Sequence, residues 1–382
     1  MDLLAALSSQ PVLTLPAFLF VLTVVVFFHE LGHFAVARWC GVDVEAFSIG
    51  FGRELVGFND RKGTRWKLCL IPLGGYVKFS GDENAASVPD HEKVAAMSAA
   101  QRAGAFVAKP VWQRAAVVAA GPVANFILAI VIFAFIFGAF GRVVSTPLVG
   151  EVQPESAAAE AGLQPGDLIT AVNGTPIETF AELQRIVSVS AGVPLQLEIE
   201  RQGQLTGLTV TPQLRELKDD FGNVQRVGLL GVSRTVQEGD RIQKTYGPFE
   251  AVKEGVNETW FVMVRTVEYI GKVVRGSEPA DQLGGPIRIA EVAGQVATLG
   301  FIPLLQLAAV LSVSIGLLNL MPVPMLDGGH LVYYAAEAVR GRPLSEKAQE
   351  FGFRIGLTLV LMLMVFATWN DLSRLVSRWL PA

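Results

Sequence analysis

The sequence predicts a polytopic α-helical membrane protein with four transmembrane helices, a membrane-associated β-hairpin or sheet, and an inserted extracytoplasmic α+β domain. Hydrophobic residues make up 51% of the 382 residues and charged residues only 17%, which is typical of a membrane protein with a substantial aqueous part. Four apolar stretches approach the roughly 20 residues that cross a bilayer, and a long segment of mixed polarity separates the second from the third. We place the four spans at about residues 15–37, 115–140, 301–325 and 355–372.

The first span ends in the most informative motif of the chain, HELGH. Residues 16–28 before it contain a single polar side chain. On a helix, positions i and i+4 share a face, so His29 and His33 can bind one metal ion together. Glu30 lies beside the open coordination position, where it can take a proton from water. Because ionisable residues at bilayer depth are costly and rarely idle, the motif predicts a hydrolase that works in or at the edge of the membrane.

This segment has two other interpretations. The histidines could be hydrogen-bonded to neighbours, with Glu30 as a stray charge, but this would place three ionisable groups beside hydrocarbon without gain. The stretch could also be a cleaved signal peptide, since residues 35–37 resemble a cleavage site. However, the first ten residues contain no Lys or Arg, whereas signal peptides favour a basic start.

The loop after the first span predicts a β-structure at about residues 46–80. Residues 65–72 read as a strand, and Gly74 and Gly75 precede a second strand at 76–79. Its apolar residues suggest that it dips into the membrane interface, where a free edge could pair with an unwound substrate. The two glycines are therefore candidate substrate-binding residues. An ordinary amphipathic hairpin on the surface is the alternative.

A third metal ligand is expected far along the chain, because a catalytic zinc site usually has three protein ligands and one water. Asp327 ends the third apolar stretch, within NLMPVPMLDGGH. That stretch runs back toward the side on which the first one ends, so Asp327 should reach the depth of the two histidines. A helix-capping Asp before Gly-Gly is the alternative. His330 is expected to pack or to support a ligand.

Two prolines, Pro322 and Pro324, are expected to break the third helix just before Asp327. Irregular backbone at membrane depth is tolerated only beside protein or a cavity. A protease needs such irregularity, because a helical substrate must be unwound before water can attack its peptide bonds. Asn319 could bind the freed substrate backbone, and an interhelical polar contact is an equal alternative.

The charges of the loops predict the orientation. The short loop between the last two spans carries Arg340, Arg342 and Lys347, so by the positive-inside rule the first and third connections lie in the cytoplasm. Both chain ends and the inserted segment then face outward, and the metal motif falls near the cytoplasmic surface. Cys40 and Cys69 belong to the cytoplasmic loop, where thiols stay reduced. Metal ligation by Cys40 is a minor alternative, since no CxxC spacing is present.

The long segment after the second span predicts an α+β domain at about residues 142–215. Strands are expected at 168–172 and 195–200, flanking a helix at 180–189. Residues 216–300 follow as an extracytoplasmic connector. Its amphipathic part, from about Phe249 to Val274, carries too many charges to span a bilayer, and we expect it to lie along the membrane surface.

The sequence GEVQPESAAAEAGLQPGDLITAVNGTPI, at residues 150–177, resembles PDZ domains of the bacterial protease-associated kind. PDZ domains take up an extended chain end by strand addition and bind its carboxylate through backbone amides. By this resemblance, the carboxylate loop is formed by Leu148, Val149 and Gly150. A PDZ domain that only blocks access sterically is the alternative.

Together, these motifs resemble the site-2 protease family of intramembrane zinc metalloproteases, in its bacterial regulator-of-sigma-E protease type. The match runs along nearly the whole chain. HExxH alone is moderately specific, whereas HExxH together with a distant membrane-embedded LDGG is highly specific. The matching segments are HELGH at 29–33, GFG at 50–52, GGYVKF at 74–79, KPVWQRAAVVAAGPVANF at 109–126, the PDZ segment, LGGPIRIA at 283–290 and LLNLMPVPMLDGGH at 317–330.

The resemblance implies a zinc metalloendopeptidase of the bacterial inner membrane. It assigns one Zn²⁺ per chain to His29, His33 and Asp327, with Glu30 as general acid/base. The implied substrates are single-span membrane proteins already shortened on the outer side, such as anti-sigma factors, and remnant signal peptides. The implied partners are these substrates and the lipid bilayer, with no nucleic acid. Substrate handling is assigned to four residues: Asn319, Pro322, Pro324 and Asn125.

One departure from the family pattern and two other function classes remain open. The sequence shows one PDZ unit where the best-known member has two, which leaves a size-filter role of the outer domain open. A membrane metal transporter would explain intramembrane His and Asp, but not Glu30, the prolines or the PDZ segment. An inactive peptide-binding scaffold would be expected to lack Glu30 or a ligand, and all of these are present.

Overall fold

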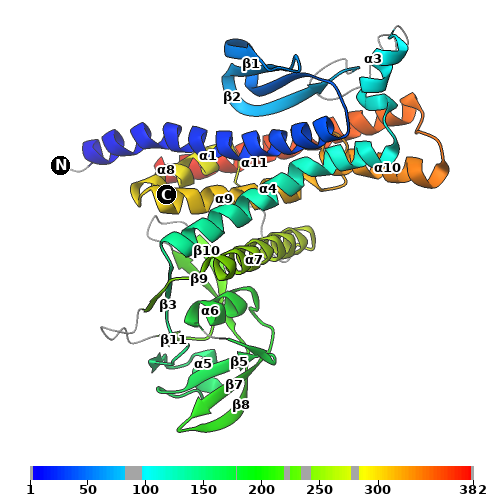
Figure 1. Cartoon of the computed structure of the whole chain (residues 1–382). Helices are drawn as coiled ribbons and strands as arrows, with labels where there is room; N and C mark the ends of the chain where they lie inside the picture. The colour runs from blue at the N-terminus through cyan, green and yellow to red at the C-terminus, as the bar shows by residue number, and fades with distance from the viewer. Residues whose placement is uncertain are drawn as a thin grey trace. The chain divides into compact units, whose positions relative to one another are not determined.

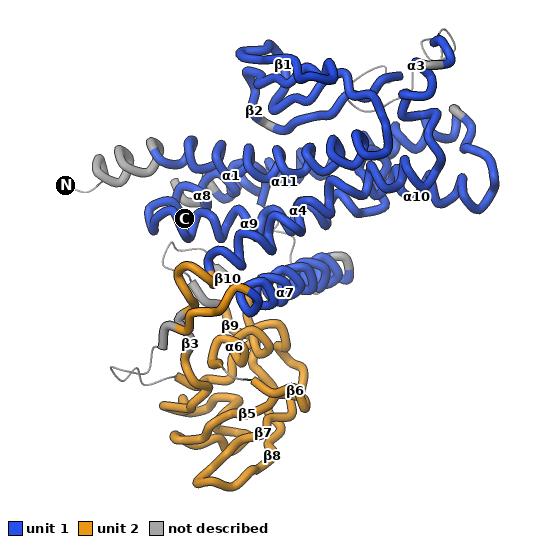
Figure 2. Tube along the Cα trace, viewed as in Figure 1, with its two compact units in different colours: residues 1–136, 249–382 blue, residues 137–248 orange. Residues whose placement is uncertain are grey.

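The computed structural model describes six ranges of the chain (Figure 1): residues 3–81, 97–177, 179–218, 224–233, 242–276 and 284–379. The chain forms two compact units (Figure 2). We call residues 1–136 together with 249–382 the helical unit, and residues 137–248 the inserted unit. The inserted unit interrupts the helical unit, which is therefore assembled from both ends of the chain.

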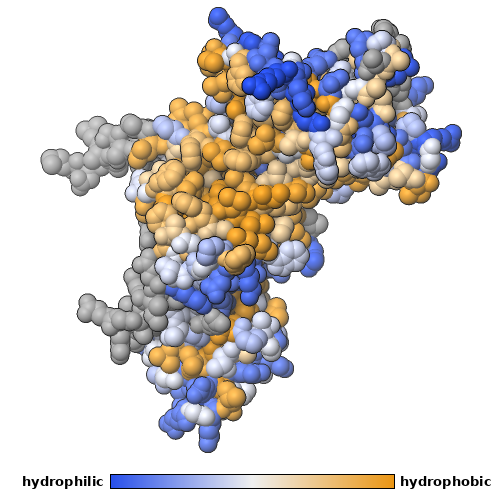
Figure 3. Space-filling model, viewed as in Figure 1, coloured by the Kyte–Doolittle hydropathy of each residue, from blue (hydrophilic) through white to orange (hydrophobic). Residues whose placement is uncertain are grey.

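Long apolar helices build the helical unit. Four of them are long and apolar enough to cross a bilayer, so the four expected spans are present; the crossing segments are Leu13–Trp39, Val111–Ala139, Phe301–Asn319 and Lys347–Arg374. The helices that contain them are α1 (Leu3–Trp39), α4 (Val111–Ala139), α9 (Phe301–Asn319) and α11 (Glu346–Trp379). Figure 3 shows hydrophobic side chains gathered over these helices.

Shorter helices complete this unit. α8 lies along α1 and α9, and α7 covers the amphipathic segment that the sequence indicated. The bounds are α3 (Ala99–Gly104), the 3₁₀ turn η1 (Phe106–Ala108), α7 (Pro248–Val274), α8 (Pro286–Thr298) and α10 (Asp327–Arg340).

The third span is shorter than its hydropathy predicts. α9 ends at Asn319 and not near residue 325, because the two prolines that follow cannot continue the helical hydrogen-bond ladder. The chain turns through residues 320–326, where Met325 has a φ of 81°, a left-handed conformation that side chains other than glycine rarely adopt. α10 then begins at Asp327.

Between the first two spans, β1 (Val44–Asn59) and β2 (Arg65–Phe79) pair into one sheet. Both strands bend, so that residues 44–49 lie between residues 75–79 on one side and residues 65–68 on the other. Within the described residues, no strand pairs with the other side of segment 75–79. We call this segment the free edge of the sheet.

The inserted unit contains a four-stranded antiparallel sheet in the order β6-β5-β7-β8. Its core is apolar and includes Ile169, Leu183 and Leu197, each 1% exposed or less. The predicted strands and the predicted helix are confirmed at 168–172, 195–200 and 180–189. The bounds are α5 (Ala157–Glu160), β5 (Leu168–Val172), β6 (Thr175–Pro176), α6 (Phe180–Val189), β7 (Leu195–Arg201) and β8 (Gln204–Val210).

The inserted unit does not end near residue 215 but continues to residue 248. The reason is strand pairing, because three further pairs return the chain to this unit and shorten the connector expected over 216–300. The pairs are β9 (Gln213–Lys218) with β10 (Val224–Leu229), β4 (Glu151–Val152) with β11 (Val232–Ser233), and β3 (Arg142–Val144) with β12 (Ile242–Lys244).

Candidate metal centre

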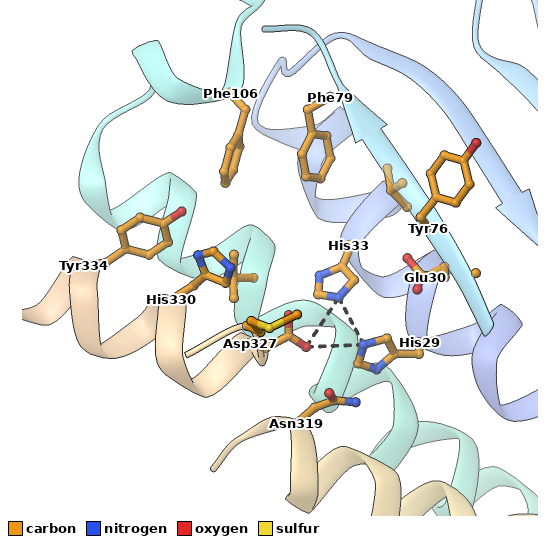
Figure 4. Close-up of a pocket in the computed structure, with 14 residues that line it drawn as sticks. His29, Glu30, His33, Tyr76, Phe79, Phe106, Asn319, Asp327, His330 and Tyr334 are labelled. Atoms are coloured by element: carbon orange, nitrogen blue, oxygen red, sulfur yellow. Dashed lines mark hydrogen bonds and ion pairs between the residues drawn. The ribbon is translucent and has the colours of Figure 1, made fainter. Parts of the chain in front are cut away.

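Three potential ligands from distant parts of the chain meet in the helical unit (Figure 4). His29 and His33 lie one turn apart on α1, and Asp327 is the first residue of α10. The two Nε2 atoms are 3.3 Å apart, and Asp327 Oδ2 lies 3.3 Å from that of His29 and 3.6 Å from that of His33. Ligand atoms about 2.0–2.1 Å from a tetrahedral zinc ion are separated by about 3.3 Å. The three side chains therefore fit zinc.

Two glycines allow α4 to approach these ligands at backbone distance. A Cβ on Gly32 of α1 would lie 2.2 Å from the carbonyl oxygen of Ala120, so the two helices touch there through their backbones. A Cβ on Gly121 would lie 2.2 Å from Nε2 of His33 and 2.9 Å from Cε1 of His29. The hydrogen side chain of Gly121 thus leaves the space around the ligand atoms free.

Hydrogen bonds orient both imidazole rings. Nδ1 of His33 lies 2.9 Å from the carbonyl oxygen of Val117, to which it can donate. This assigns the proton to Nδ1 and leaves the Nε2 lone pair for a metal. Nδ1 of His29 lies 3.3 Å from the side-chain amide of Asn125. In the same tautomer it needs an acceptor, which the otherwise unpartnered amide oxygen of Asn125 provides when the amide is turned over.

The structure places Asn125, which was expected to handle substrate, against one of the metal ligands. Its side chain is completely buried, and its amide lies 3.3 Å from Nδ1 of His29. Its function in this geometry is to fix the orientation of a ligand, since partners of this kind set the tautomer and basicity of metal-binding histidines.

Asp327 provides the anionic ligand. Its Oδ2 atom is buried without a hydrogen-bond donor of its own. A buried carboxylate oxygen directed at two ring nitrogens is an arrangement that a cation would stabilise.

Glu30 faces the same centre from α1, next to the free edge of the sheet. The backbone N–H of Val77 hydrogen-bonds to its carboxylate. A Cβ on Gly75 would lie 2.9 Å from Cγ of Glu30, so the free edge passes over this side chain in direct contact. Glu30 and the metal ligands open into one cavity of about 220 Å³.

Of the residues expected to handle substrate, Asn319 and Gly75 line this cavity, whereas Gly74 and the two prolines are not among its lining residues. Gly74 has a φ of 117° and provides the bend at the start of the free edge. Pro324 packs against α11. The last three residues therefore shape the backbone around the cavity.

Further residues line the cavity, among them His330, which was expected to pack or to support a ligand. His330 lies near Asp327 (Figure 4), and burial lowers its pKa. The others are apolar or aromatic, and single-sequence patterns did not distinguish them from ordinary core residues. Some of them lie in GGYVKF or close to the GPVAN segment. They are Tyr76, Val77, Phe79, Phe106, Val118, Met325 and Tyr334.

In the inserted unit, the proposed carboxylate loop is already engaged. The N–H of Val149 donates to the carbonyl of Asp167, and the N–H of Gly150 donates to the carbonyl of Ser233. Leu148 forms a β-bridge with Leu168. These contacts argue against capture of a chain-end carboxylate by the amides of Val149 and Gly150.

The fold is that of a polytopic membrane protein, and its metal centre combines two histidines and one carboxylate beside a glutamate. Together these features define the class of membrane metallopeptidases. The model of Peptidase family M50 matches residues 17–363, which include all four of these side chains, and the chain belongs to this family. The resemblance to site-2 proteases is thus confirmed, and the chain is a zinc metalloprotease of the M50 family.

The similar proteins are named for the same chemistry. "Putative zinc metalloprotease Atu1380" of Agrobacterium fabrum is 54% identical over 360 residues, which cover 94% of this chain and 96% of the relative. "Metalloprotease MmpA" of Caulobacter vibrioides is 44% identical, with 94% and 95% covered. "Regulator of sigma-E protease RseP" of Salmonella typhimurium is 36% identical, with 94% and 98% covered.

Proposed function

We propose that this chain is an intramembrane zinc metalloendopeptidase that hydrolyses peptide bonds within the transmembrane segments of single-span proteins. The observation that carries the proposal is the meeting of His29, His33 and Asp327 beside Glu30, in a cavity bordered by the free edge of the sheet. Both histidines belong to a helix segment able to cross a bilayer, so the reaction would take place at membrane depth.

The residues of the site divide the chemistry among them. Zinc, when bound by the three ligands, supplies a Lewis acid and lowers the pKa of a coordinated water toward ~7. Glu30 accepts a proton from the attacking water and passes it to the leaving amine. Asn125 and the carbonyl of Val117 hold the two imidazole rings in the orientation that ligation requires.

The free edge provides a means of holding an unwound substrate. An extended chain can add to it as a further strand, so that main-chain hydrogen bonds align the substrate past the metal centre. The amide of Asn319 lies within the same cavity and can bond to the unwound backbone. Both contacts need a substrate segment that has left its helical conformation.

The orientation and cellular role follow from the charges and the family. The basic loops place the site near the cytoplasmic face of a bacterial inner membrane, with both termini and the inserted unit outside. α7 would lie along the outer surface through an exposed apolar face that includes Val256 and Trp260. Substrates would be anti-sigma-factor-like proteins already shortened outside, together with remnant signal peptides. We regard the inserted unit as a PDZ domain that excludes long outer segments sterically.

Replacing the proposed base tests this function. In proteoliposomes with a single-span substrate, the wild-type protein should cut within the span. Glu30→Gln should keep its zinc but lose cleavage by about 10²-fold or more, because proton transfer is removed. Asp327→Asn should lose both zinc and cleavage.

Two outcomes would contradict the proposal. Undiminished cleavage by Glu30→Gln would remove the proposed base from the mechanism. Zinc uptake into sealed vesicles without any peptide cleavage by the wild-type protein would favour the transporter alternative.

A further inference from the structure

The cavity extends beyond the metal ligands into an end built from apolar and aromatic side chains. Figure 4 shows Phe79 and Phe106 on the side of the ligands opposite Asn319, with Tyr334 beside them. Val118 of α4 lines the same cavity. We call these four residues, Phe79, Phe106, Val118 and Tyr334, the aromatic recess.

Contacts of the wall residues with one another and with Arg114 hold the recess in shape. The rings of Phe79 and Phe106 stack with their centroids 4.8 Å apart and an angle of 26°. The guanidinium of Arg114 lies 5.0 Å from the centroid of the Tyr334 ring. Arg114 also donates to Glu337 over 2.6 Å and to the carbonyl of Lys109 over 3.0 Å. The recess is therefore preorganised and need not collapse when empty or rearrange when filled.

The recess offers no cationic partner for an acidic side chain. None of its four members is charged, and within the described residues the acidic side chains that line the cavity, Glu30 and Asp327, belong to the metal centre. Arg114 does not line the cavity and is already paired with Glu337. An acidic side chain placed in the recess would lose its hydration without a cationic partner among these residues, whereas a large apolar side chain would exchange water for aromatic contacts.

The free edge leads directly into the recess. It begins at Gly75, donates to Glu30 through the N–H of Val77, and ends at Phe79, a recess wall. Phe79 lies two residues beyond Val77, the position bonded to Glu30. Because adjacent residues of a strand are about 3.3 Å apart, this is a short step along the free edge. A substrate strand paired with this edge would place a side chain in the recess one or two residues from the bond being cut.

We propose that the aromatic recess is the subsite that recognises a large, uncharged side chain of the substrate one or two residues from the scissile bond. This proposal rests on the proposed function, since it assumes a peptide held along the free edge. It adds a sequence preference to the site: a bulky apolar or aromatic residue on the Phe79 side of the cleaved bond, and exclusion of acidic residues there.

A change that fills the recess tests the proposal. Val118→Phe adds a ring inside it, and the matched control Val131→Phe makes the same change on the same helix at a position that is 57% exposed. The substrates are single-span proteins in proteoliposomes, identical except for Ala, Leu, Phe or Glu at successive positions around the cleavage site, compared by kcat/KM.

For the wild-type protein and the control, we expect one such position where Phe and Leu exceed Ala by about 10-fold or more and Glu is the poorest substrate. Val118→Phe should lower kcat/KM for Phe by about 10-fold or more while the value for Ala changes little, and bound zinc should stay equal. If Val118→Phe does not fold, Phe106→Ala provides the opposite change, and it should improve cleavage of a substrate with Trp at that position.

The proposal is overturned if wild type shows no side-chain preference at any position, or if the folded recess variants keep the wild-type order of substrates. Failure of the proposed function would look different, since the wild-type protein would then cleave none of the substrates.

Discussion

At the scale of single residues, the metal centre depends on one position where no side chain can be accommodated. Gly121 lies on the second span against both histidines, and a Cβ there would intrude to 2.2 Å from Nε2 of His33. Alanine is a better helix former than glycine, so the local helix of α4 would be retained in a substituted protein. An added methyl group would instead displace the ligand side chains.

We therefore expect Gly121→Ala to reduce zinc affinity and cleavage together, because the added methyl displaces the His33 ring from the ligand position. Competition with a chromophoric zinc chelator measures the affinity, and hydrogen exchange across α4 measures whether the helix is intact. Gly271→Ala is the control, since its Cβ would meet only the Arg275 side chain, at 3.8 Å. Unchanged zinc affinity in Gly121→Ala would show that the ligands do not need this close approach.

The sequence predicted some of these residues and missed others for a physical reason. His29, Glu30 and His33 were found because helical periodicity alone puts two imidazoles on one face. The contact of Asn125 with the ring of His29 was missed, because such a contact is a tertiary property. The recess residues carry no periodic signal that separates a cavity wall from a core.

At the scale of elements, the last span supports the loop that carries the third ligand. A Cβ on Gly356 of α11 would lie 2.0 Å from the carbonyl oxygen of Pro324, and a Cβ on Gly352 would lie 2.0 Å from the Tyr333 hydroxyl. Pro324 immediately precedes Met325, whose left-handed backbone persists only where the surroundings fix it. α11 thus packs through two glycines against the segment that positions Asp327.

A substitution at this contact should weaken zinc binding, although the contact does not involve a ligand side chain. Gly356→Ala would push α11 and the Pro324 backbone apart, and we expect zinc affinity to fall by about 10-fold or more, as for other supports of metal ligands. Titration with the same chelator measures this effect. Leu361→Ala, on the same helix at a side chain that is 46% exposed, should leave the affinity unchanged. Equal affinities for both variants would mean that α11 does not support the ligand loop.

The sequence predicted these elements better than it predicted their contacts. Hydropathy located all four spans, and the two prolines correctly indicated a break before Asp327, although the helix ended earlier than expected. The pairing of β11 and β12 with strands far back in the chain was missed, because two- and three-residue strands leave no periodic pattern. The packing of α11 against Pro324 was also missed, since it depends on how α11 is placed against the loop before α10.

At the scale of the whole molecule, every residue of the metal centre and of the cavity belongs to the helical unit. The ligands come from both sides of the inserted unit in sequence, yet none comes from within it. The match in membrane depth between Asp327 and the histidines was predictable from the direction of the spans. That the helices carrying them are neighbours in the membrane plane was implied by the family resemblance, because hydropathy does not specify which helices are neighbours.

This division predicts that the inserted unit governs which substrates are cut and not whether the site can cut. Replacing residues 137–248 by a flexible Gly/Ser linker should leave zinc content and cleavage of a substrate with a trimmed outer segment close to the wild-type values. Cleavage of the same substrate with a long folded outer domain should rise, because a steric barrier has been removed. Both substrates are compared in proteoliposomes, with Glu30→Gln introduced into the shortened protein as the control for background proteolysis. If the long substrate remains uncut while the trimmed one is cleaved normally, exclusion must reside in the helical unit; if neither is cut and zinc is retained, the inserted unit is needed for substrate binding.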